Sequence, residues 1–90
     1  MESEHKYTEI GKIIISEAEK KIEEGRIIKQ KGENLIALGY KVGGNRSIVE
    51  KIEREGEREI IIGKQIINEG LMMKEDGEER IRFGKMLDKR

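Results

Sequence analysis

Hydrophobic residues along this chain recur with a seven-residue period that glycine marks. The glycines of two arrays fall seven or fourteen residues apart, and one alanine fills the gap at the same spacing. The arrays consist of Gly11, Ala18, Gly25, Gly32 and Gly39, followed by Gly56, Gly63, Gly70, Gly77 and Gly84. Apolar residues gather three and four positions after these small residues, which on a helix places them on either side. Each array therefore predicts a long amphipathic helix whose apolar stripe is centred on glycine.

The small residues and the apolar rows together form the predicted helix-packing interface. Its apolar members are Ile14, Ile15, Ile22, Ile28 and Ile36, then Ile52, Ile60, Ile66, Ile67 and Ile81. An interior glycine destabilises a helix by about 0.8–1 kcal/mol relative to alanine. Glycines that keep one register through two helices therefore need a structural reason. That reason is close backbone approach, because glycine has no Cβ to hold a neighbouring helix away.

A turn signal between the two arrays predicts that the helices fold back on each other. Residues 42–45 read Val-Gly-Gly-Asn, the strongest turn signal in the chain. Ser47 and Glu50 have the spacing of a capping box at a helix start. We expect one domain over 1–90, with a helix over about 3–40, a turn over 41–46 and a helix over about 47–89.

The glycine spacing predicts the register of this hairpin independently of the turn. A reversal about Gly44 sets residue i level with residue 88 − i, which pairs Gly32 with Gly56 and Gly25 with Gly63. The turn signal and the glycine pairing thus locate the reversal at the same place. The predicted fold class is all-α, an antiparallel two-helix hairpin resembling a coiled coil.

A two-helix hairpin leaves part of the apolar pattern uncovered. Ile10, Ile62 and Phe83 each precede a heptad glycine by one residue. The stripe widens further on that side at residues two positions after a glycine, namely Ile13, Ile27, Met72 and Met86. Exposed apolar strips of this kind mark association. We therefore expect at least a dimer, in a four-helix bundle or a larger helical assembly.

Composition narrows the chemistry and the setting. The chain has 19 basic and 19 acidic residues, 42% charged residues, and no cysteine, proline or tryptophan. No disulfide, cysteine zinc site or thiol nucleophile is therefore possible. The charge-rich, cysteine-free composition follows a trend of hyperthermophile proteins, so we expect a thermophile source. Strictly apolar runs reach only four residues, which predicts no membrane span, no signal peptide, and a location in the cytoplasm or within a virion or filament.

The candidate chemical sites have simpler explanations. His5, the only histidine, has Glu2 and Glu9 within one helical turn, which is too few ligands for a structural zinc site. The acidic stretch at 53–59 contains Arg54 and Arg58, the one at 75–79 is followed by Arg80 and Arg82, and both lack the Glu-x-x-His motif of di-iron bundles. They indicate a solvent face with ion pairs. We expect no catalytic, cofactor or metal site, and no enzyme.

The expected function is that of a non-enzymatic structural or interaction protein. The hairpin would be an assembly subunit or adaptor, with a second copy of itself as the main partner and another protein as a further one. The alternative is a nucleic-acid-binding hairpin dimer with a lysine-rich face at Lys12, Lys20, Lys29, Lys31 and Lys41. Against it, each half of the chain is neutral and no aromatic residue lies among the first four of these lysines for base stacking.

The predicted architecture resembles several families of small helical hairpins. It is similar to plasmid RNA-binding hairpins that dimerise into four-helix bundles and to small adaptor hairpins of archaeal viruses. It is also similar in length to the WXG family of secreted hairpins, whose Trp-x-Gly turn stands here as Val-Gly-Gly-Asn at 42–45. No motif of these families carries over residue by residue, so the resemblance implies a helical hairpin and no particular activity.

Overall fold

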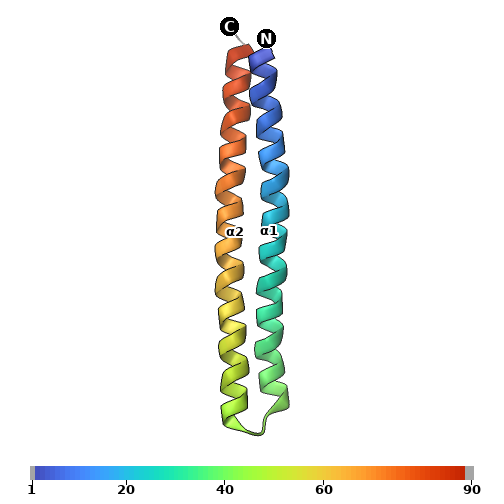
Figure 1. Ribbon diagram of the computed structural model, residues 1–90, viewed down its shortest axis with the longest axis vertical. Coiled ribbons are helices and arrows are strands. Elements are labelled where there is room, and N and C mark those ends of the chain that lie inside the picture. Colours follow the sequence, from blue (N-terminus) through green and yellow to red (C-terminus); the bar gives the residue numbers. More distant parts are fainter. Residues whose placement is uncertain (1, 89–90) are drawn as a thin grey trace. The chain divides into compact units, whose positions relative to one another are not determined.

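The chain folds into two helices joined by a short loop (Figure 1). The computed structural model describes the backbone of residues 2–88 and the side chains of residues 6–87. Helix α1 spans Glu2–Val42 and helix α2 spans Arg46–Asp88, and residues 2–88 contain no strand. The fold is thus the all-α helical hairpin that the glycine pattern predicts.

The loop is shorter than the predicted turn over 41–46, because α1 continues through Val42. The first residues to leave the helical region are Gly43 and Gly44, with φ angles of 57° and 79°. These left-handed angles favour glycine, which has no Cβ to clash. The Gly43 N–H donates to the Gly39 carbonyl oxygen at 3.4 Å, a bond that ends many helices. The glycines themselves therefore set the end of α1, two residues beyond the predicted end at residue 40.

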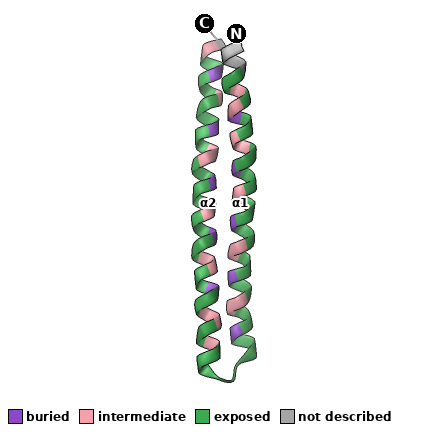
Figure 2. Ribbon diagram, viewed as in Figure 1, coloured by how far each residue is buried: buried purple, intermediate pink, exposed green. Residues whose placement is uncertain are grey.

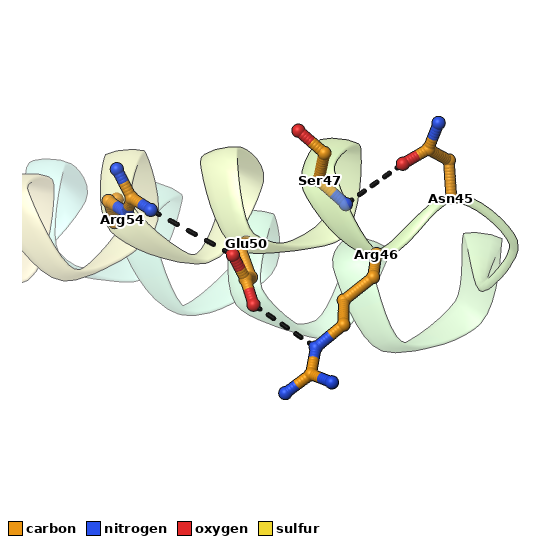
Figure 3. Close-up of polar contacts among 5 residues, drawn as sticks. All are labelled: Asn45, Arg46, Ser47, Glu50 and Arg54. Carbon is orange, nitrogen blue, oxygen red and sulfur yellow. Dashed lines mark hydrogen bonds and ion pairs between the residues drawn. The ribbon is translucent and has the colours of Figure 1, made fainter.

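Asn45 caps the start of α2 (Figure 3). Its side-chain Oδ1 accepts a hydrogen bond from the Ser47 N–H at 2.9 Å. Its carbonyl oxygen accepts from the N–H groups of Ile48 and Val49, both at 3.1 Å. These bonds satisfy N–H groups that have no partner within the first turn of the helix.

The predicted capping box of Ser47 and Glu50 is therefore wrong. Ser47 lies inside the first turn, and the carboxylate of Glu50 contacts arginines instead of a backbone N–H (Figure 3). Glu50 Oε1 lies 3.2 Å from Arg46 Nε, and Glu50 Oε2 lies 3.8 Å from Arg54 Nη2. Asn45 already fills the capping role two residues earlier, so the Ser-x-x-Glu spacing has no cap left to form.

The hairpin consists of two compact units, each built from a part of both helices. The terminal unit comprises Met1–Ile22 and Asn68–Arg90, and the loop unit comprises Glu23–Ile67. Within each unit the two helical segments run antiparallel and side by side (Figure 1). Buried positions lie on the sides of the segments that face each other (Figure 2).

The apolar core of each unit is thin. Among the described side chains, the buried hydrophobic ones are Ala18, with no exposed surface, and Ile22. The other isoleucines of the predicted packing rows are half-buried. Neither helix, over its described residues, has a stretch long and apolar enough to cross a membrane.

Candidate association surface

Glycines of α1 and α2 face each other in layers, at the register predicted from the sequence. The three glycine–glycine layers are Gly11 with Gly77 in the terminal unit, and Gly25 with Gly63 and Gly32 with Gly56 in the loop unit. A Cβ built on any of these six glycines would lie 2.5–2.8 Å from the carbonyl oxygen of its partner. Real Cβ atoms do not approach so closely, so the backbone spacing in these layers depends on glycine. The predicted register is confirmed.

The space that each missing Cβ leaves is also lined by the partner helix. An isoleucine four residues after the partner small residue places Cγ1 at 2.6–2.8 Å from the built Cβ. These isoleucines are Ile15, Ile22, Ile36, Ile60, Ile67 and Ile81. Heptad positions are numbered from the small residue of each heptad, so these isoleucines form the +4 row and the residues one position earlier form the +3 row. The +4 row therefore packs directly over the glycines of the opposite helix.

Two layers differ from the glycine–glycine ones. Opposite Gly70 stands Ala18, and a Cβ on Gly70 would meet the Ala18 carbonyl oxygen at 3.1 Å. Opposite Gly39 the heptad position is held by Val49, since 88 − 39 is 49. A Cβ on Gly39 would lie 3.4 Å from Ile52 Cγ2, which is ordinary van der Waals contact. The helices therefore leave room for a methyl group at Gly39 that they do not leave at Gly32.

Two of the lysines that interrupt the apolar rows contact the opposite helix by packing or by an ion pair. Lys29 replaces an isoleucine in the +4 row, and its Cβ would lie 2.8 Å from a Cβ on Gly63. Lys21 replaces one in the +3 row, and its Nζ lies 2.9 Å from Glu69 Oε2 on α2. The aliphatic stem of a lysine can pack while its amino group reaches solvent or a carboxylate.

The positions beside the +3 row form one side of the terminal unit. Lys21 follows a heptad small residue by three, and Glu69 precedes Gly70 by one. Tyr7 and Phe83 hold the same two heptad positions, and their rings meet edge to face with centroids 4.9 Å apart. Position +3 of α1 is therefore adjacent to position −1 of α2.

The loop unit has the same arrangement. A shallow groove is lined by Lys31 and Leu35 of α1 and by Glu55, Arg58 and Glu59 of α2. All five residues hold heptad positions −1, +2 or +3. A groove on the opposite side is lined by residues at +1, +4 and +5, which are Arg26, Lys29, Gln30, Glu33 and Ile67. In each unit, the −1 and +2 positions of both helices therefore lie on one common side.

We call the apolar residues on that side the apolar flank. In the terminal unit it comprises Ile10, Ile13, Met72, Phe83 and Met86, and in the loop unit it comprises Ile27, Leu38, Ile48 and Ile62. All of them are exposed except Ile10, which is half-buried. On the opposite side, the exposed large hydrophobic residues among those described are Tyr40, Ile61 and Leu71. In each unit, more of the exposed large hydrophobic residues lie on the flank side than on the opposite side.

The sequence analysis missed a second apolar surface, which surrounds the loop. Leu38, Tyr40, Val42 and Ile48 are all exposed, and we call these four residues the loop tip. Residues 34–49 contain no Asp or Glu. This gap in the acidic residues was visible in the sequence. Ile48 has no heptad glycine after it, because Val49 holds that position, and Tyr40 and Val42 lie outside the −1 and +2 positions.

The lysines of the nucleic-acid alternative do not share one face. Lys12, Lys20 and Lys29 lie 3.9, 3.4 and 3.9 Å from carboxylates on α1 itself. With Lys31 and Lys41 they occupy four different heptad positions, which spread around the helix. Among the described residues, no group of three His, Asp or Glu side chains is placed to hold a metal ion. The side chain of His5 lies outside the described residues.

Comparison with protein-family models, with curated proteins and with solved structures finds no match to this chain.

Proposed function

We propose that this chain is a non-enzymatic structural or interaction protein whose hairpin associates with a second copy through the apolar flank. The observation that carries the proposal is the one-sided exposure of that flank in both units. Soluble monomers rarely expose contiguous apolar patches larger than a few hundred Å², and larger patches usually mark an interface. A dimer of hairpins would place the flank in the core of a four-helix bundle.

The thin core supports the same proposal. Only Ala18 and Ile22 are buried among the described apolar side chains, while the isoleucine rows stay half-exposed. A small domain depends on buried apolar area to offset its loss of conformational entropy. A second hairpin would cover the exposed half of the +3 row and the flank together.

The test compares two adjacent isoleucines of the loop unit. Ile62 lies on the apolar flank and is 38% exposed, while Ile61 lies about 100° away around α2 and is 57% exposed. We expect the parent chain and Ile61→Lys to have at least twice the 10.4 kDa chain mass by light scattering. Ile62→Lys should shift the mass towards the monomer at the same concentration.

Comparing Ile61→Lys with Ile62→Lys distinguishes association through the apolar flank from non-specific association through exposed apolar area. If exposed apolar area alone drove association, Ile61→Lys would have the larger effect, because Ile61 is the more exposed. A parent chain that runs as a 10.4 kDa monomer at micromolar concentration, with full helicity and a cooperative melt, contradicts the proposal.

A further inference from the structure

We propose that the loop tip inserts into the headgroup layer of an anionic lipid surface. The tip combines four exposed apolar residues with two basic residues, Lys41 and Arg46. This composition is local: 42% of the chain is charged, yet residues 34–49 contain no carboxylate at all.

The direction of Tyr40 favours a lipid surface over a second hairpin. Leu38 and Tyr40 precede and follow the buried Gly39 by one residue, so each lies about 100° from it, on opposite sides of α1. Tyr40, on the side away from the apolar flank, is 74% exposed. A hairpin packed on the flank side would cover Leu38 and Ile48, which both hold heptad position −1, and leave Tyr40 in water. A bilayer surrounds an inserted tip on every side.

The polar groups of the loop limit the depth of insertion. Residues 43–45 are exposed, and a backbone outside helices and sheets needs water or headgroup partners. The tip would therefore stop at the interface, where the amphipathic ring of a tyrosine is most favourable. Lys41 extends from the last turn of α1, and Arg46 begins α2, so both cations sit at the level of the headgroups.

The charge of the loop tip determines which lipid headgroups it would bind. An anionic surface attracts basic residues close to it and repels carboxylates. The nearest acidic residues to the loop are Glu33 and Glu50, and Glu50 is already paired with Arg46 and Arg54. The tip thus carries two cations, Lys41 and Arg46, of which Arg46 shares the single carboxylate of Glu50 with Arg54.

The experiment is vesicle flotation of the full chain with two lipid compositions. One vesicle is phosphatidylcholine alone, and the other contains phosphatidylserine in a ratio of seven to three. We expect binding to the anionic vesicle only, and its loss at high salt, because salt screens surface charge. Tyr40→Ser should weaken this binding about tenfold, since it removes the largest exposed ring of the tip.

Leu71→Ser is the matched control. Leu71 also follows a heptad glycine by one residue and is 51% exposed, but it belongs to the terminal unit. It should leave vesicle binding unchanged, whereas Lys41→Glu should weaken binding at least fivefold. Circular dichroism on each variant checks that the helices persist.

Three results would overturn the proposal. They are no flotation with either vesicle, equal flotation with both vesicles at all salt concentrations, or an equal loss in Leu71→Ser and Tyr40→Ser. The first would assign the tip to a protein partner instead. Because Tyr40 lies off the apolar flank, the oligomer mass of the same samples tests self-association separately.

Discussion

A Cβ built on Gly32 would lie 2.5 Å from the carbonyl oxygen of Gly56, and a Cβ on Gly56 would lie 2.7 Å from the carbonyl oxygen of Gly32. The two residues thus depend on each other's missing side chain. This reciprocity explains why glycine recurs on both helices, although it lowers the helix propensity of each. The backbones approach closely, and the flanking isoleucines reach across to cover the opposite glycine.

The Ala18–Gly70 layer predicts that the methyl group of Ala18 stabilises the fold. Ala18 is fully buried, so Ala18→Gly removes buried methyl surface as well as helix propensity. We expect it to destabilise the fold by about 1.5 kcal/mol. Ala37→Gly, at an exposed position of α1, should cost only about 0.8–1 kcal/mol. Urea unfolding at one protein concentration compares them, and equal losses would mean that the Ala18 methyl group makes no packing contribution.

The cap of α2 predicts that the side chain of Asn45 contributes more to stability than the side chain of Ser47. Asn45→Ala removes the side-chain acceptor of the Ser47 N–H, and should destabilise the fold by about 1 kcal/mol. Ser47→Ala should change the stability by less than about 0.5 kcal/mol, because the Ser47 side chain makes no capping bond here. Thermal unfolding of both variants decides between them. A larger loss in Ser47→Ala would restore the capping box of Ser47 and Glu50.

The aromatic pair of the terminal unit predicts a measurable coupling between the helices. The rings of Tyr7 and Phe83 meet edge to face, a geometry worth about 0.5–1.5 kcal/mol beyond buried area. A double-mutant cycle with Tyr7→Ala and Phe83→Ala should therefore give a coupling energy in this range. Tyr7→Ala with Met86→Ala provides the comparison, because Met86 is exposed on the same flank. Additive effects in the first pair would show that the ring contact does not form in solution.

The sequence was sufficient for the fold and the register, because glycine at heptad spacing encodes both the buried side of each helix and its partner layer. It was insufficient where two local signals competed. Ser47 and Glu50 have the spacing of a capping box, but Asn45 lies nearer the loop and forms the cap of α2. The sequence also gives no sign that the heptad glycines differ in the room they leave for a methyl group. The difference between Gly32 and Gly39 lies in what an added Cβ would meet, the Gly56 backbone in one case and the Ile52 side chain in the other, and only the structure shows this.

The loop tip was missed for a related reason. Its four residues are spread over heptad positions −1, +1 and +3, so the seven-residue period does not group them as one surface. They come together because Gly43 and Gly44 reverse the chain sharply and bring the end of α1 beside the start of α2. The one sequence signal, the absence of Asp and Glu over 34–49, is compositional and not periodic.

The most direct test of close glycine packing is to compare Gly32→Ala with Gly39→Ala by urea unfolding at equal protein concentration. Both glycines are buried in α1 and hold the same heptad position. A methyl group on Gly32 would collide with the Gly56 backbone, whereas one on Gly39 would make ordinary contact with Ile52. We predict that Gly32→Ala destabilises the fold by about 1–3 kcal/mol through overpacking, and that Gly39→Ala stabilises it by about 0.5–1 kcal/mol through helix propensity. If Gly32→Ala is as stabilising as Gly39→Ala, the two backbones do not meet at the glycines and the account is contradicted.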